Sequence, residues 1–166
     1  MAREINIKPN GLQKLTHRFL MLKPVSKILS VILYRADNFV FWLTKGRSSV
    51  ARIVGLPIIQ LTTKGAKTGQ LRTMPLATVP DGEQLVLIAS YFGGERNPGW
   101  YYNLKAHPEC VVILNGISRT YTAKEVFGEE RELYFQKAVS YYAGYKLYRE
   151  RAAHRHIPVM VLEPKP

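Results

Sequence analysis

The chain has 166 residues, a length typical of one domain with its own buried core. Hydrophobic residues make up 46% of the chain and aromatic residues 11%, which excludes a disordered protein. The formal charge of +12 favours an anionic partner: nucleic acid, a lipid headgroup surface or a phosphorylated cofactor.

The N-terminal third is basic and has a helical pattern. Residues 1–52 carry ten Lys or Arg side chains against two acidic ones, a net +8 of the total charge. Apolar residues recur at helical spacing over 12–22 and again over 25–43. The second stripe ends in an aromatic and basic flank of a kind found at lipid interfaces. These helices are expected either to cover one end of the core or to touch a membrane surface, and 28–34, the most apolar window, is too short to span a bilayer.

Beyond residue 52 the pattern changes from helical to strand-like. Strands are predicted at about 56–63, 71–79, 84–91, 109–115, 118–126 and 157–162, with helices at 100–106 and 129–151 and a loop at 92–98. Strong turn signals, Pro80-Asp81-Gly82-Glu83 and Asn115-Gly116, join neighbouring strands. The predicted fold class is α+β. A small barrel of about six mostly antiparallel strands with flanking helices (53–166) follows a helical N-terminal extension (1–52), and the two form one structural unit.

A basic, glycine-containing turn joins the first two predicted strands. Gly65 and Gly69 mark this turn, and Lys64, Lys67 and Arg72 flank it. Backbone N–H groups released in such a turn, beside three cations, form a concavity suited to an anion. The simpler alternative is a solvated loop without a ligand.

The sequence contains no convincing metal or nucleophile motif. His154 and His156 have no carboxylate or thiol cluster near them in sequence, so they are expected to be surface histidines. Nucleophile-elbow, P-loop and Gly-x-Gly-x-x-Gly patterns are absent. The single cysteine, Cys110, lies in a strand-like run and is expected to be a buried thiol.

Three tyrosines near the C-terminus form the most unusual aromatic pattern. Tyr142, Tyr145 and Tyr148 lie three residues apart, so on a helix they can point together from one face. One interpretation is that their rings pack against the barrel with the hydroxyls at the water boundary. The other is that they wall an aromatic substrate, to which one of them donates a proton or a hydrogen bond.

Taken in order, these motifs resemble the deazaflavin-dependent nitroreductase family. The resemblance covers about 52–164 and is carried by 61–75, Asp81-Gly82, Ala89-Ser90, 93–98, 100–108 and Ile157-Pro158. It implies a split β-barrel that binds coenzyme F420, a deazaflavin whose phosphate and oligoglutamate tail need cationic contacts. It further implies an oxidoreductase that transfers a hydride from reduced F420 to an electron-poor acceptor such as a quinone, an activated enone or a nitro compound.

The resemblance also assigns the site residues. The cofactor's phosphate and tail are expected at Lys67, Thr68, Gly69, Gln70 and Arg72. The remaining cofactor-binding residues are expected to be Leu61, Thr62, Pro75, Leu76, Ala89, Ser90, Gly93 and Gly94. Ser90, Tyr142, Tyr145 and Tyr148 form the catalytic, substrate-facing side, with Ser90 and Tyr142 or Tyr145 as hydrogen-bond or proton donors. Trp100, Tyr101 and Asn103 are expected to fix the short helix beside the cofactor.

Two residues depart from the family pattern. Ala66 stands where relatives often carry Arg, and Ala77 where some nitroimidazole-reducing members carry an aromatic residue, so activity on bulky nitroimidazoles is not expected.

Two alternative functions stay open, an FMN-binding relative of the same barrel and a non-catalytic module that holds a lipid or an anionic ligand. Nucleic acid is not an expected partner because no recognition module is present. The expected location is the cytoplasm, with the N-terminal helices as candidates for peripheral contact with the inner face of the membrane, and the oligomeric state is left open.

Overall fold

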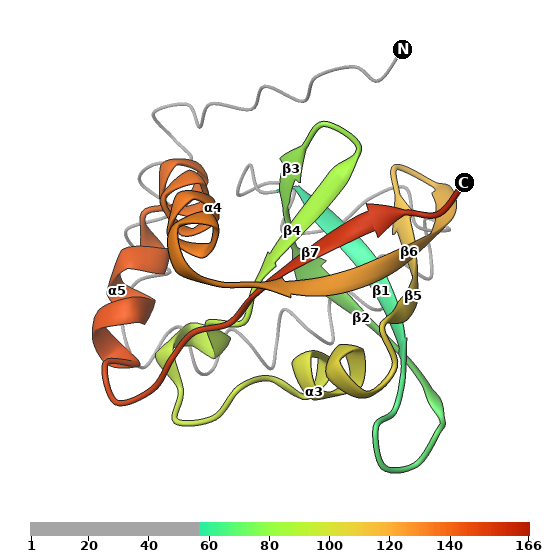
Figure 1. The fold of residues 1–166 in the computed structure, drawn as a ribbon, viewed down its shortest axis with the longest axis horizontal. Helices are drawn as coiled ribbons and strands as arrows, with labels where there is room; N and C mark the ends of the chain where they lie inside the picture. Colours follow the sequence, from blue (N-terminus) through green and yellow to red (C-terminus); the bar gives the residue numbers. More distant parts are fainter. Residues whose placement is uncertain (1–56) are drawn as a thin grey trace.

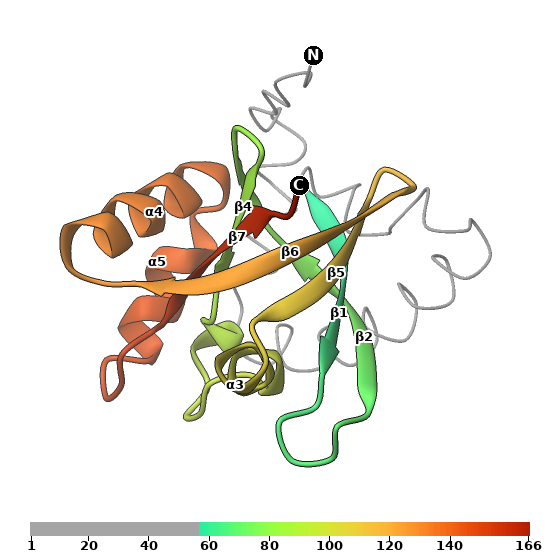
Figure 2. The same cartoon turned by 45° about the vertical axis from the view of Figure 1, so that its right-hand side comes forward.

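The computed structural model describes residues 57–166, which form one curled antiparallel sheet with helices around it (Figures 1 and 2). The strands are β1 (Ile58–Lys64), β2 (Leu71–Ala77), β3 (Val79–Asp81), β4 (Gln84–Ile88), β5 (Glu109–Leu114), β6 (Ile117–Val126) and β7 (Val159–Pro164). The helices are η2 (Tyr91–Gly93, a 3₁₀ turn), α3 (Gly99–Ala106), α4 (Gly128–Tyr141) and α5 (Gly144–Arg151). The expected N-terminal extension lies outside the described residues. Within those residues, no helix has the length and apolar character needed to cross a membrane.

The strand order explains why the sheet closes on itself. It runs β2-β1-β5-β6-β7-β4-β3, so β2 and β3 are the two edge strands. The chain leaves β2 at Ala77 and enters β3 at Val79, with Thr78 alone between them. Opposite edges that are one residue apart in the chain must also be close in space, and the sheet therefore curls into a half-barrel. Thr78 pins this junction, because its N–H donates to Pro57 O at 2.9 Å and its hydroxyl to Val86 O at 3.1 Å.

Buried side chains lie on both faces of the sheet. Inside the curl, Ile59, Leu61, Leu87 and Met160 pack with Trp100 and Leu104 of α3. On the outer face, Val86, Ile88, Val159 and Val161 pack against α4 and α5. Because β4 and β7 are covered on both faces, their sequences are almost continuously apolar. The expectation that the Cys110 thiol is buried is confirmed.

The predicted fold class is confirmed, with three corrections to its elements. The predicted strand 71–79 divides at Thr78, which gives seven strands. The predicted strand 84–91 ends at Ile88, because the chain turns at 90–93. The predicted single helix over 129–151 is wrong, since it breaks between Tyr141 and Gly144. At this break the Tyr142 ring occupies the space that a Cβ on residue 144 would need.

Candidate functional site

The turn between β1 and β2 is a compact loop that extends beyond the sheet (Figure 2). The N–H of Gly65 donates to Gln70 O and the N–H of Gly69 donates to Gly65 O, both at 2.8 Å. Gly69 has a left-handed φ of +68°, which glycine adopts without steric strain. A Cβ at Gly65 would lie 2.7 Å from the Thr68 hydroxyl and 3.1 Å from Gln70 O, so a side chain there would require Thr68 to move.

Asn103 anchors this turn to α3. The Asn103 amide nitrogen donates to the Thr63 hydroxyl, and its amide oxygen accepts from the Ala66 N–H, each at 3.0 Å. The other two expected anchors of α3 are also engaged: Trp100 is buried in the core, and the Tyr101 hydroxyl donates to the Glu125 carboxylate at 3.2 Å. The turn is therefore tied to α3 by two hydrogen bonds of Asn103, one buried and one partly buried.

The cations of the turn are not neutralised by the folded chain. Lys64, Lys67 and Arg72 are exposed, and none of them forms an ion pair with a carboxylate of residues 57–166. Six carboxylates elsewhere do pair with cations: Asp81, Glu83, Glu109, Glu125, Glu132 and Glu163. Within the same part of the chain, the N–H groups of Lys67 and Thr68 have no hydrogen-bond acceptor. The turn therefore offers positive charge and free donors to an anion.

The expected cofactor-binding residues of β1 and β2 are divided between the two faces of the sheet. Leu61 is buried inside the curl, and Leu76 packs against that same core. The Thr62 side chain lies on the opposite face of β1, where its hydroxyl is hydrogen-bonded to the Thr73 hydroxyl at 2.8 Å. Pro75 is opposite Gln60 in the ladder and shares the face of Thr62.

A second turn follows β4 and contains the predicted residues Ala89, Ser90, Gly93 and Gly94. Ala89 and Ser90 are buried, and the N–H of Gly93 donates back to Ser90 O at 2.9 Å. Gly93 has a φ of +79°, and a Cβ there would lie 2.5 Å from the Cβ of Arg151. The absence of a side chain at Gly93 is thus what lets this turn lie directly against α5.

The three tyrosines form a buried cluster beside this second turn. Tyr142, Tyr145 and Tyr148 are each at most 6% exposed, with ring centroids 5.8 to 6.1 Å apart. The hydroxyls of Tyr142 and Tyr148 are 3.3 Å apart, and the Phe92 ring meets Tyr148 edge-on at 5.7 Å. Burial raises the pKa of all three phenols, which therefore stay protonated at neutral pH and can act as donors. The structure brings the 89–94 turn and the tyrosines together.

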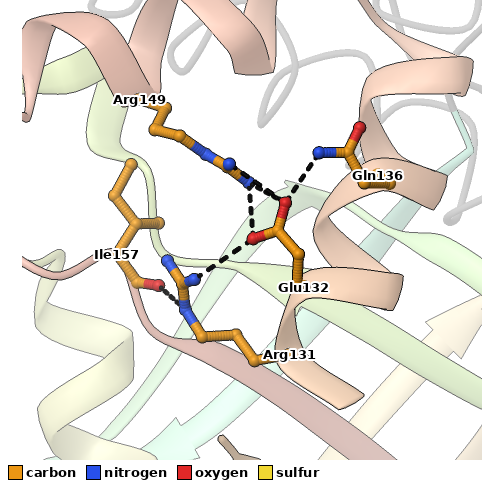
Figure 3. A network of polar contacts seen from close by, with 5 residues as sticks. All are labelled: Arg131, Glu132, Gln136, Arg149 and Ile157. Atoms are coloured by element: carbon orange, nitrogen blue, oxygen red, sulfur yellow. Dashed lines mark hydrogen bonds and ion pairs between the residues drawn. The ribbon is translucent and has the colours of Figure 1, made fainter. Parts of the chain in front are cut away.

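A polar network joins α5, which carries Tyr145 and Tyr148, to α4 (Figure 3). The Glu132 carboxylate of α4 accepts from Arg149 of α5 at 3.0 to 3.1 Å and from Gln136 at 2.7 Å. Hydrogen bonds from Gln136 and Arg149 lower the pKa of Glu132, so it is ionised at neutral pH. Arg131 joins the network at 3.7 Å and donates to Ile157 O, which ties α4 to the segment before β7.

The β1–β2 turn and the tyrosine cluster lie on different sides of α3. Both views place α3 between the β1–β2 turn and the region of η2 and α5 (Figures 1 and 2). Sequence reasoning missed Arg155, whose side chain faces the 89–94 turn, because no motif surrounds it and its acceptors are about 60 residues away.

The chain is similar to known F420-dependent proteins. The sequence model of the F420H(2)-dependent quinone reductase family matches residues 34–164. An F420H(2)-dependent quinone reductase from Mycobacterium tuberculosis is 39% identical over 99 residues, which cover 59% of this chain and 66% of that relative's length. A solved structure of an F420-H2 dependent reductase has a TM-score of 0.60 at 38% identity and covers 64% of this chain and 94% of its own. A further solved structure, described only as a domain-swapped dimer, has a TM-score of 0.62 at 34% identity, with coverages of 84% of this chain and 96% of its own.

Proposed function

The chain belongs to the F420H(2)-dependent quinone reductase family, and from this premise we propose that it is an oxidoreductase that uses reduced F420 to reduce a quinone. The expected deazaflavin family is thereby confirmed. Bound in its reduced form, F420 supplies a hydride to the acceptor. The protein's contribution is to hold the cofactor, orient the acceptor and stabilise the charge that develops on the acceptor.

One observation carries the proposal: three exposed cations without carboxylate partners in residues 57–166 surround a rigid glycine turn. Lys67, Thr68, Gly69, Gln70 and Arg72 hold the phosphate and the acidic tail, through two cationic side chains and the free N–H groups of Lys67 and Thr68. Ala66 contributes no charge, and its N–H is already engaged by Asn103. Anion binding at this turn therefore depends on Lys64, Lys67 and Arg72.

The second turn and the tyrosine cluster form the acceptor side. Ser90 and either Tyr142 or Tyr145 donate a hydrogen bond or a proton to the acceptor oxygen as it gains negative charge. Burial raises the pKa of Tyr142 and Tyr145. Both phenols therefore keep the proton that this role requires.

The decisive experiment is an anaerobic titration of the full chain with F420 and, separately, with FMN. F420 is expected to bind more tightly than FMN, and Lys67→Gln or Arg72→Gln to weaken F420 binding about ten- to one-hundredfold, as expected for a lost hydrogen bond to a charged group. Arg119→Gln is the matched control, since Arg119 is an exposed cation on β6 that lies 3.7 Å from Glu83. Failure to bind F420, or a preference for FMN, contradicts the cofactor assignment.

Turnover separates an enzyme from a binding module. Adding a water-soluble quinone to the protein with reduced F420 should produce a loss of reduced-cofactor absorbance that depends on both the protein and the quinone. Binding without such oxidation would favour the non-catalytic alternative.

Two finer features belong to the same proposal. Residues 53–166 form the cofactor-binding domain, and the basic segment 1–52, with its net +8, contacts anionic membrane surfaces where lipid-soluble quinones are found. Co-sedimentation of the full chain with anionic vesicles, but not with neutral ones, is the expected result. Equal recovery with both vesicle types would contradict the membrane contact and leave the reductase assignment intact.

A further inference from the structure

Arg155 lies in the segment between α5 and β7, and its guanidinium donates hydrogen bonds to neutral carbonyl and amide oxygens. Its Nε donates to Gly94 O at 2.8 Å, and one terminal nitrogen donates to Ser90 O at 2.8 Å and Ala89 O at 3.4 Å. The other terminal nitrogen contacts the Asn97 amide oxygen and the carbonyl of His156. No carboxylate of residues 57–166 forms an ion pair with Arg155.

These acceptors lie on both sides of one short turn. Ala89 and Ser90 precede the pair Tyr91–Phe92, whereas Gly94 and Asn97 follow it. A guanidinium is planar and presents five N–H donors in fixed directions, so it can hold several carbonyls in one arrangement. A lysine ammonium offers three donors on a flexible stem and cannot reproduce that arrangement.

The turn needs such a restraint because its backbone is strained. Tyr91 and Phe92 both have left-handed φ values, +47° and +57°, although neither is glycine. Their side chains are 56% and 44% exposed, and the Phe92 ring contacts the Tyr148 ring edge-on at 5.7 Å, so the turn is only partly held by packing. Strained residues of this kind persist where the surroundings over-determine their conformation, and they concentrate at functional sites.

We propose that Arg155 is a positioning residue for the reductase. Its hydrogen bonds to the carbonyls of Ala89, Ser90 and Gly94 fix the positions of Ser90 and of the Tyr91–Phe92 turn on the acceptor side. This inference rests on the proposed function. Arg155 itself contacts neither acceptor nor cofactor in this role. Its effect on the reaction is therefore on acceptor orientation and not on anchoring of the cofactor tail, which depends on cations on the other side of α3.

The kinetic test compares Arg155→Lys and Arg155→Gln with the wild-type full chain, and uses Arg119→Lys on β6 as the matched control. For both Arg155 variants kcat with a water-soluble quinone is expected to fall about ten- to one-hundredfold and the quinone KM to rise, since small displacements of reacting groups are that costly. F420 affinity should change by less than about threefold, because the tail cations are distant and independent. A merely structural role predicts a lower melting temperature with kcat and KM unchanged per folded molecule, and that result would overturn the inference.

Amide hydrogen exchange of the apoprotein gives a readout that does not depend on the proposed function. Arg155→Lys should speed exchange at Gly93 and Gly94 by about tenfold or more, while Arg119→Lys leaves it unchanged. If the wild type proves inactive with quinones, the proposed function fails. The exchange result still tests whether the hydrogen bonds of Arg155 hold the 89–94 turn in place. Unchanged exchange, or faster exchange with unaltered kinetics in an active enzyme, would each refute the positioning role.

Discussion

Asn103 links α3 to the β1–β2 turn through two hydrogen bonds. We expect Asn103→Leu to lower the free energy of unfolding by about 1–3 kcal/mol, because the buried Thr63 hydroxyl loses its hydrogen-bond partner. The same change releases the Ala66 N–H and should weaken F420 binding. Urea denaturation and F420 titration measure the two effects.

A matched variant separates stability from turn geometry. Thr63→Val removes only the bond between Asn103 and Thr63 and keeps the one between Asn103 and Ala66. It should therefore be destabilised to a similar degree yet retain most of its F420 affinity. Equal losses of affinity in both variants would argue against control of the turn by Asn103.

The buried thiol of Cys110 makes stability depend on pH in the alkaline range. Burial raises the pKa of Cys110 from 9.0 to about 12, so the folded chain holds this proton more tightly than the unfolded chain. The stabilisation is complete below pH 9 and is lost as the pH rises toward 12, by about 1.4 kcal/mol per pH unit. Urea midpoints at pH 9, 10 and 11 should fall in the wild type and fall less steeply in Cys110→Ala. Parallel curves would show that other groups cause the decline.

At the scale of elements, the contact between η2 and α5 depends on the missing side chain of Gly93. Gly82, in the turn between β3 and β4, also has a left-handed φ, +60°, but a Cβ there would meet nothing within 4 Å. Gly82→Ala therefore measures backbone strain alone, about 1–3 kcal/mol. Gly93→Ala adds a collision with Arg151 and should be destabilised by a further 1–3 kcal/mol or so. Chemical denaturation gives the free energy of unfolding of both variants. If both lose a similar amount, α5 can move away from a Cβ at residue 93 at little cost.

The elements that sequence reasoning located correctly are those specified by local signals. Asn115-Gly116 and Asp81-Gly82 give their hairpins through turn chemistry. The break at Thr78 was missed because 71–79 reads as continuously extended, and the division depends on hydrogen bonds to Pro57 and Val86. The break after α4 was missed because it depends on the packing of the Tyr142 ring over Gly144.

The candidate site likewise combines features set by local sequence with features set by contacts between distant residues. The glycines and cations of the β1–β2 turn lie within one short stretch of the chain, so the sequence alone predicts a basic turn there. Asn103 and Arg155 bond to groups roughly 40 and 60 residues away, and such contacts leave no local pattern. The burial of Tyr142, Tyr145 and Tyr148 against the outer face of the sheet agrees with the interpretation, made from the sequence, that their rings pack against the barrel.

At the scale of the whole molecule, charge is distributed unevenly. Residues 57–166 carry 14 Lys or Arg and ten Asp or Glu, a net +4, and six of the ten carboxylates are paired with cations away from the β1–β2 turn. The turn thus keeps an unscreened positive charge on a folded unit that is otherwise close to balanced. Attraction of an acidic tail to exposed cations should weaken as salt shortens the Debye length from about 30 Å at 0.01 M to about 8 Å at 0.15 M.

We therefore expect the dissociation constant of F420 to rise with salt, and the slope of that rise to reflect the number of turn cations engaged. Lys67→Gln and Arg72→Gln should each flatten the slope, and Arg119→Gln should not. A deazaflavin without phosphate or glutamates should bind more weakly and with little salt dependence, since it presents no anionic tail to the turn. Fluorescence titrations from 0.01 to 0.5 M NaCl, roughly the range over which screening changes most, make the measurement. A salt slope that is the same for the tailless ligand would place the electrostatic contact away from Lys67 and Arg72.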